Sequence, residues 1–154
     1  IVNAEKKNKA IKYNIELKAK PEYDTIFTPE PKEFVSLVIE LLKKYDVLSK
    51  TNLQSFDLRI LEEIKKQNKN IEVALLVEED EDINTKLSQL SYKPEIISPY
   101  FKLLSQKSIQ NYQENGFKII PWTVNTIEDM KLLINYKVDG IITDYPDRLL
   151  ELLN

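Results

Sequence analysis

The strongest constraint on the fold is a regular alternation between short apolar segments and amphipathic helical segments. Residues 71–77 are apolar on both faces after the first turn, so both faces of this strand must be covered, as in parallel sheets. Apolar residues at helical spacing follow each extended segment. The alternation predicts a parallel α/β fold. The extended segments are expected at residues 13–18, 47–56, 71–77, 96–97, 117–125 and 138–144.

Capping residues mark where the helices begin and end. Pro31 fits the first turn of a helix, where its missing N–H costs nothing. Asp57, Ser105 and Thr126 can each cap a helix, and Gly116 can end the helix that Ser105 begins. Two further helices are expected at residues 83–90 and 148–153.

The length of 154 residues allows one domain. An open doubly wound sheet fits this length directly, whereas a complete (β/α)8 barrel needs roughly 250 residues. A barrel therefore requires that residues 1–154 be part of a longer domain. Length alone favours the open sheet, and polar residues on the predicted strands favour the barrel.

Composition excludes several kinds of chemistry. The chain has 22 basic and 25 acidic residues, a net charge of −3, no His, no Cys and two Gly. This balance argues against a nucleic acid or an anionic membrane as partner, and no apolar run is long enough to span a bilayer. A Ser-His-Asp triad, a cysteine nucleophile and a Gly-rich phosphate loop cannot be built. The charged run at residues 1–7 is unlike a signal peptide, and the lack of cysteine leaves the compartment open.

The first predicted strand carries two opposite charges on one face. Period-2 alternation places Asn14, Glu16 and Lys18 opposite an apolar face, so in a barrel they point into the interior. There the two charges can pair with each other, or bind a cation and an anion. The equally weighted alternative is an exposed edge strand with both charges in water.

Polar and aromatic residues also stand at the ends of later strands, where barrel enzymes build their active sites. Trp122 can form a flat wall for a polyol, or be a large core residue. Asp57 and Asp144 are expected to be helix caps. The acidic run 78–82 lacks the spacing of a calcium loop and is expected to be a solvated loop.

These segments resemble the glycerophosphodiester phosphodiesterase family over nearly the whole chain. The first strand resembles the family's Asn-Ile-Glu-(Ile/Leu)-Lys strand. The other matching segments, in the family's order, are residues 18–22 (Lys-Ala-Lys-Pro-Glu), 27–31 (Phe-Thr-Pro-Glu-Pro), 54–57 (Gln-Ser-Phe-Asp), 121–125 (Pro-Trp-Thr-Val-Asn) and 139–146 (Asp-Gly-Ile-Ile-Thr-Asp-Tyr-Pro).

The resemblance implies a (β/α)8 TIM barrel to which residues 1–154 contribute the C-terminal part, from about strand four onward. It implies that Glu16 is one of three carboxylate ligands of a divalent cation, calcium or magnesium. Lys18 then serves catalysis at the phosphate, and Phe56 and Trp122 bind the glycerol end of the substrate. The family hydrolyses glycerophosphodiesters to glycerol 3-phosphate and an alcohol, a metal-dependent reaction of lipid and glycerol metabolism.

The same resemblance implies that half of the catalytic machinery lies upstream. Upstream of the matched segments the family has a His-Arg-Gly segment, a Glu-x-Asp metal pair and a second histidine. We therefore expect residues 1–154 alone to be inactive and to supply only part of the ligands of the metal ion. Their partner is then the N-terminal half of the same barrel. Two alternatives remain: a non-catalytic barrel that binds a polyol or phosphate, and a barrel phosphodiesterase acting on phosphoinositides. Relatives are often exported or periplasmic, and a cytoplasmic location stays open.

Overall fold

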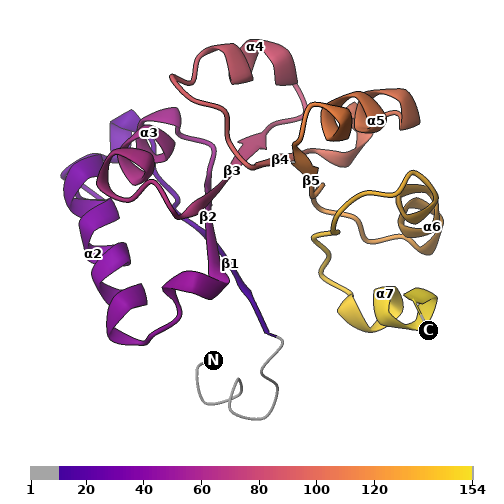
Figure 1. The fold of residues 1–154 in the computed structure, drawn as a ribbon, viewed down its shortest axis with the longest axis horizontal. Coiled ribbons are helices and arrows are strands. Elements are labelled where there is room, and N and C mark those ends of the chain that lie inside the picture. The colour runs from indigo at the N-terminus through magenta and orange to yellow at the C-terminus, as the bar shows by residue number, and fades with distance from the viewer. Residues whose placement is uncertain (1–10, 154) are drawn as a thin grey trace. The chain divides into compact units, whose positions relative to one another are not determined.

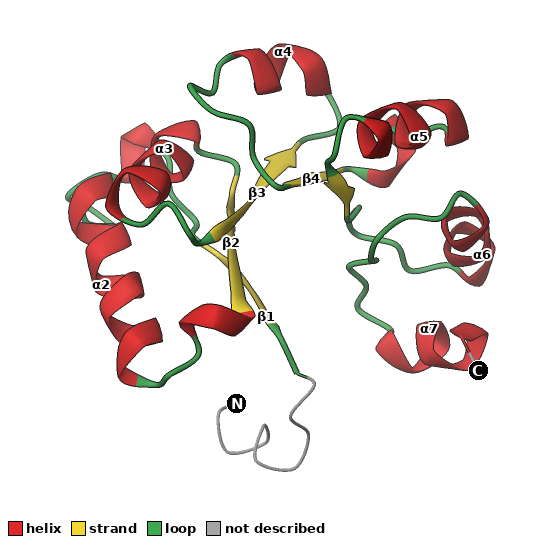
Figure 2. Ribbon diagram, in the orientation of Figure 1, coloured by secondary structure: helices red, strands yellow, loops and turns green. Residues whose placement is uncertain are grey.

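The computed structural model describes residues 11–153 of the protein. The interpretation of the charged run 1–7 lies outside these residues. Figures 1 and 2 show strands and helices in alternation along the chain. The elements are β1 (Tyr13–Glu16), the 3-10 helix η1 (Pro21–Tyr23), α2 (Pro31–Lys44), η2 (Leu48–Lys50), β2 (Thr51–Ser55), α3 (Leu58–Gln67), β3 (Glu72–Val77), α4 (Ile83–Ser88), β4 (Ile96–Pro99), η3 (Phe101–Leu103), α5 (Gln106–Glu114), β5 (Lys118–Ile119), α6 (Ile127–Asn135) and α7 (Pro146–Leu153).

The five strands form one sheet whose order, β1-β2-β3-β4-β5, is their order along the chain. β1 and β2 are parallel, with Glu16 opposite Gln54, and β4 and β5 are parallel, with Ile96 opposite Lys118. Parallel neighbours require a crossover connection, and the helices between successive strands provide it. The predicted α/β class with a parallel sheet is confirmed.

The described residues form two compact units, divided between Ala74 and Leu75. In the first unit α2 and α3 lie beside each other and flank the β1–β2 pair (Figure 1). Asp57 caps α3 by accepting a hydrogen bond from the backbone N–H of Arg59, as the sequence predicts. Burial of each large apolar side chain contributes about 1.5–3 kcal/mol. The core side chains of this unit include Leu17, Val35, Leu53, Ile60, Leu61 and Ile64.

The second unit has its own apolar cluster, in which Val124, Met130 and Leu133 are buried. Ser105 caps α5 and Thr126 caps α6, so both predicted caps are confirmed. Gly116 follows α5 with φ of 78°, the left-handed conformation that glycine adopts at helix ends. Side chains from η3, α7 and the segment between α6 and α7 pack on the cluster, among them Phe101, Tyr136, Ile141 and Leu149.

Three predicted extended segments differ from the observed structure. Leu48–Lys50 form η2, because the carbonyl of Val47 accepts hydrogen bonds from Lys50 N and Thr51 Oγ1 and favours a local turn. The strand predicted over 117–125 is limited to β5, although Ile120 N and Trp122 N still donate to Ile97 O and Pro99 O. Pro121 has no N–H to donate on its other side, where Ile142 N donates to Pro121 O.

The last predicted strand, 138–144, is also wrong. Asp139 N donates to Ile119 O, Ile142 N donates to Pro121 O, and Ile142 O accepts from Val124 N, each at 2.9 Å. These bonds hold the segment beside residues 119–124 without forming a continuous ladder, and residues 138–144 contain no strand. None of the helices between residues 11 and 153 has the length and apolar character needed to cross a bilayer.

Candidate active site at the strand ends

Glu16 and Lys18 stand at the carboxyl end of β1, where the structure brings them together. Lys18 Nζ lies 2.8 Å from Glu16 Oε1, and the side chains are 79% and 23% exposed, respectively. The strand end is held by a hydrogen bond from Leu17 N to Gln54 O and by one from Ser55 Oγ to Leu17 O. An exposed ion pair of this kind contributes about 0–1 kcal/mol. Lys18 can therefore exchange Glu16 for another anion at little cost.

The polar face of β1 continues onto β2 as a ladder of matched side chains. Asn14 lies opposite Asn52, and Asn52 Nδ2 donates to Asn14 Oδ1 at 2.6 Å. Glu16 lies opposite Gln54, whose side chain is buried. Gln54 Oε1 has no hydrogen-bond partner among the described residues. A buried acceptor without a partner costs free energy unless a ligand or water donates to it. Gln54 therefore adds a polar group beside Glu16 to the candidate site, one not among the residues predicted from the sequence.

Phe56 follows β2 directly and is half-buried. Its position is fixed because Ser55 Oγ, which donates to Leu17 O, also accepts a hydrogen bond from Asp57 N. Since β1 and β2 are parallel, their carboxyl ends lie at the same edge of the sheet. Glu16, Lys18 and Phe56 therefore belong to neighbouring strand ends of one unit.

An arginine cluster, not anticipated from the sequence, supports this edge. Arg59 Nη1 and Nη2 donate to the Asp24 carboxylate at 2.6 and 3.2 Å, and Arg59 Nη2 donates to Asp57 Oδ2 at 2.6 Å. The hydrogen bonds to Asp57, followed by those to Asp24, raise the pKa of the Arg59 guanidinium. The cluster ties the loop after β1 to the N-terminus of α3. Asp24 and Arg59 are 35 residues apart, so only the fold reveals the contact.

Trp122 belongs to the second unit and is half-buried among aromatic side chains. Its indole Nε1 donates to Ser98 O at 2.8 Å, and its ring centroid lies 5.9 Å from that of Tyr100. The Tyr100 ring in turn lies 5.1 Å from Phe101. Trp122 thus has both a fixed orientation and partial exposure, and Tyr100 and Phe101 extend the aromatic surface that the sequence assigned to Trp122 alone.

The remaining acidic candidates have local hydrogen-bond partners. Asp144 Oδ2 accepts from Asn125 Nδ2 at 2.8 Å, which connects the segment before α7 to the segment before α6. In the acidic loop, Lys86 Nζ donates to Glu81 Oε1 at 2.7 Å. Asp82 caps α4, and its hydrogen bonds from Thr85 lower the pKa of its carboxyl group.

The described residues do not by themselves make up a divalent-cation site. Residues 11–153 contain no group of three or more His, Cys, Asp or Glu side chains placed to hold a metal ion. A calcium or magnesium ion takes six or more oxygen ligands. Glu16 supplies one carboxylate, with the Lys18 ammonium beside it. Any cation at Glu16 therefore needs ligands beyond this set.

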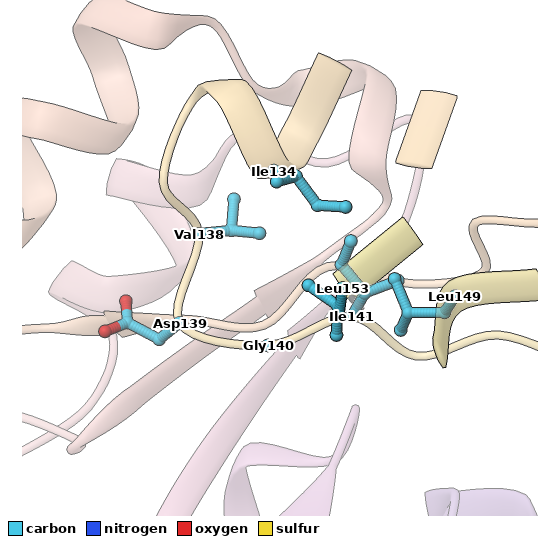
Figure 3. Close-up of a pocket in the computed structure, with 7 residues that line it drawn as sticks. All are labelled: Ile134, Val138, Asp139, Gly140, Ile141, Leu149 and Leu153. Atoms are coloured by element: carbon cyan, nitrogen blue, oxygen red, sulfur yellow. The ribbon is translucent and has the colours of Figure 1, made fainter. Parts of the chain in front are cut away.

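A separate apolar pocket of about 210 Å³ lies in the second unit, between α6, α7 and the segment before α7 (Figure 3). Its single charged lining residue, Asp139, points its carboxylate away from Ile141, Leu149 and Leu153 (Figure 3). That carboxylate accepts hydrogen bonds from Ile119 N and Gln113 Nε2. The pocket offers no acid–base group, and none of the four predicted site residues lines it.

The sequence model of the glycerophosphoryl diester phosphodiesterase family matches residues 2–148. A glycerophosphodiester phosphodiesterase of Caldanaerobacter subterraneus subsp. tengcongensis is 30% identical over 118 residues, which cover 75% of this chain and 47% of the relative. The chain thus spans about half the length of this relative.

Two solved structures share the fold. A protein of Silicibacter pomeroyi DSS-3 superposes with a TM-score of 0.84 at 24% identity, covering 99% of this chain and 53% of its own. A phosphodiesterase of Oleispira antarctica, solved in complex with the product sn-glycerol-3-phosphate, gives a TM-score of 0.75 at 18% identity, covering 93% of this chain and 55% of its own. At these identities the likeness is one of fold.

Proposed function

The chain belongs to the glycerophosphoryl diester phosphodiesterase family, and on this premise we propose that the whole protein hydrolyses glycerophosphodiesters to glycerol 3-phosphate and an alcohol. The observation that carries the proposal is the Glu16–Lys18 pair beside Gln54 at the end of β1. The Oleispira antarctica phosphodiesterase, which shares the fold, was solved with sn-glycerol-3-phosphate as its product. The reaction class and the roles of Glu16 and Lys18 are those that the family resemblance implies, and the pairing of the two side chains at the strand end supports them.

In this proposal Lys18 binds the phosphoryl oxygens. Its ammonium group now faces one carboxylate oxygen at 2.8 Å and is otherwise exposed, so a phosphate can replace Glu16 as its partner without burying a charge. A cation placed where negative charge grows stabilises the transition state, and removal of one such group costs about 100- to 1000-fold in rate. Lys18 acts in binding and in electrostatic stabilisation.

Glu16 is proposed as one ligand of a divalent cation, calcium or magnesium, whose other ligands come from outside residues 11–153. When bound, such a cation supplies charge neutralisation at the phosphate. Gln54 Oε1 can accept a hydrogen bond from a ligand hydroxyl or from water held near Glu16. The sequence contains no histidine, so the groups that move protons to the leaving alcohol are also proposed to lie elsewhere in the protein.

Phe56 and Trp122 are proposed as the apolar wall for the glycerol end of the substrate. Both side chains are half-buried and follow strand segments. An aromatic face packs against the carbon skeleton of a polyol while the hydroxyl groups keep their hydrogen bonds. The oriented indole of Trp122, fixed through Ser98, suits this role.

Residues 1–154 are proposed to be only part of the barrel. The family is barrel-like, and a parallel sheet of five strands alternating with helices agrees with part of a barrel. We propose that residues 1–154 form the C-terminal part of a single (β/α)8 barrel domain, from about strand four onward. The chain covers about half the length of each of these relatives, which supports this assignment.

The test compares the whole protein with residues 1–154, each assayed for release of glycerol 3-phosphate with a divalent cation and with a chelator. We expect activity in the whole protein, loss of that activity with chelator, and none in residues 1–154. Adding the remaining part of the protein to residues 1–154 should restore activity, which separates a missing half from a failure to fold. Turnover by residues 1–154 alone would contradict the proposal that the other metal ligands and the proton-transfer groups lie elsewhere in the protein. A whole protein that binds glycerol 3-phosphate without turnover would support the non-catalytic alternative.

A further inference from the structure

The arginine cluster of Arg59, Asp24 and Asp57 joins the two segments that follow β1 and β2. Arg59 Nη1 and Nη2 donate to the two oxygens of Asp24, at 2.6 and 3.2 Å. Arg59 Nε donates to both oxygens of Asp57 at 3.1 Å, and the two carboxylate side chains are only 14% and 7% exposed. One planar guanidinium thus holds two carboxylates, each through both oxygens, which is a geometry that the single ammonium group of lysine cannot reproduce.

Buried hydrogen bonds join the same two segments at the strand ends. Ser55 Oγ donates to Leu17 O at 2.7 Å and accepts from Asp57 N at 3.1 Å. Leu17 and Ser55 are almost fully buried. The chain after β1 is therefore attached to the chain after β2 at Leu17, and the arginine cluster attaches it a second time at Asp24.

The two attachments enclose two predicted site residues. Lys18 follows Leu17 directly, so it lies in the short segment between the attachments at Leu17 and Asp24. Phe56 is flanked on both sides by the residues that make the attachments from β2. The Lys18 side chain is 79% exposed, so its location depends on the backbone that carries it and little on packing. Groups that hold a binding residue in place contribute to affinity without touching the ligand.

The contact with Asp24 is not needed to begin α3. Asp57 caps this helix by accepting a hydrogen bond from Arg59 N at 2.9 Å. The Arg59 side chain also pairs with Asp57 independently of Asp24, through Nε and Nη2. What Asp24 adds is the attachment of the segment after β1, so this attachment can be removed without removing the cap.

We propose that Arg59 is a positioning residue, which holds Asp24 beside Asp57 and thereby fixes the segment that carries Lys18 relative to Phe56. The roles of Lys18 and Phe56 in substrate binding, on which this proposal rests, belong to the proposed function. Arg59 itself contacts no substrate and acts through the backbone of the two segments.

The selective variant is Asp24→Ala in the whole protein, which removes the attachment and leaves Arg59 paired with Asp57. The affinity for sn-glycerol 3-phosphate, measured by calorimetric titration, should fall on the order of tenfold, and kcat/KM for hydrolysis should fall at least as much. The control is Glu63→Ala, which removes an equally exposed carboxylate (14%) that pairs with Lys66 on α3 at 3.5 Å. This control should keep the affinity and turnover of the wild type.

A double-mutant cycle distinguishes positioning from a general loss of structure. If the attachment acts through Lys18, Asp24→Ala should weaken binding on the order of tenfold in the wild type, but only about twofold or less when Lys18→Met is already present. Losses of equal size in the two backgrounds would overturn the positioning role, because a general defect adds to the loss of Lys18.

Amide hydrogen exchange tests the attachment without any ligand. The N–H groups of Tyr23 and Phe27 donate within the loop, to Lys20 O and Tyr23 O, each at 2.9 Å. In Asp24→Ala these amides should exchange on the order of tenfold faster, while the amides of α3 keep wild-type rates. In Glu63→Ala the loop amides should exchange as in the wild type. Unchanged exchange of the loop amides in Asp24→Ala would overturn the inference.

The outcomes separate this inference from the proposed function. A wild type that neither hydrolyses a glycerophosphodiester nor binds sn-glycerol 3-phosphate would contradict the proposed function, and the exchange rates would still decide whether the arginine cluster holds the loop. Hydrolysis by the wild type, with unchanged exchange and affinity in Asp24→Ala, would contradict only the positioning role of Arg59.

Discussion

The strand ends of the two units differ in chemistry and in support. In the first unit, a continuous parallel register places Glu16 opposite Gln54, so charged and amide groups stand on a regular ladder. In the second unit, Tyr100 and Trp122 meet in an isolated bridge beyond the end of β5. A regular strand register fixes the positions of its side chains, which suits polar groups that must bind a ligand in one geometry. An aromatic ring needs no such ladder, because it contacts a ligand through its face. The two strand ends are therefore suited to different kinds of contact, charged in the first unit and apolar in the second.

The largest expected effect concerns the charged strand end. Glu16→Gln in the whole protein keeps the side-chain shape but removes the negative charge proposed to hold a cation. We expect kcat/KM for glycerophosphodiester hydrolysis to fall on the order of 100-fold and the cation concentration for half-maximal activity to rise. The matched control is Glu22→Gln, which changes an exposed carboxylate six residues later. Unchanged cation dependence would remove the proposed role of Glu16.

The next effect concerns the apolar side of the same ladder. Leu53 is fully buried on β2, between Asn52 and Gln54. Leu53→Ala should lower the free energy of unfolding by about 2–5 kcal/mol, because it leaves a cavity beneath the polar face. Urea denaturation of the whole protein measures this, with the exposed Leu41→Ala on α2 as control, expected within about 0.5 kcal/mol of the wild type. If Leu53→Ala changes the free energy of unfolding as little as Leu41→Ala does, burial of Leu53 does not stabilise the β1–β2 pair.

Trp122→Phe distinguishes a wall from a core role in the second unit. The substitution keeps an aromatic ring but deletes the donor to Ser98 O. If Trp122 is a half-buried residue that contacts the substrate, Trp122→Phe should lower the free energy of unfolding by about 1 kcal/mol. KM should stay nearly unchanged, because an aromatic ring is kept. Destabilisation well above that value, with KM unaffected by Trp122→Ala, would assign Trp122 to the core.

The smallest effect is a pH dependence away from both strand ends. Hydrogen bonds from Thr85 lower the pKa of Asp82 in the folded protein, so the associated stability is present above the carboxyl group's usual pKa and is lost as the pH falls through the lowered value. Asp82→Asn keeps a capping acceptor and should flatten this part of the acid unfolding curve. Asp80→Asn in the same loop is the control. If Asp82→Asn leaves the acid part of the unfolding curve unchanged, Asp82 is not the group responsible for this pH dependence.

Local signals predicted the helices well. Asp57, Ser105 and Thr126 cap helices as expected, because a cap depends on residues within one turn of the chain. The strands were predicted less well, since a strand exists only where a partner completes its ladder. Proline removed one donor at position 121, and residues 138–144 acquired only intermittent bonds.

The candidate site was predicted in part. Alternation along one strand was enough to place Glu16 and Lys18 on one face, and the structure shows them paired. The same alternation on the next strand could have identified Gln54, which lies opposite Glu16. The contact of Arg59 with Asp24 spans 35 residues and carries no local pattern. The roles of Glu16, Lys18, Phe56 and Trp122 in binding and catalysis stay predictions.

Calorimetric titration of the whole protein with sn-glycerol 3-phosphate and with glycerol tests the central claim most directly, because Lys18 is proposed to bind the phosphate and not the polyol. Lys18→Met should weaken the affinity for glycerol 3-phosphate on the order of tenfold or more, while the affinity for glycerol stays that of the wild type. Lys12→Met, an exposed lysine that precedes β1, should leave both unchanged. Equal affinity of wild type and Lys18→Met for glycerol 3-phosphate would contradict the account.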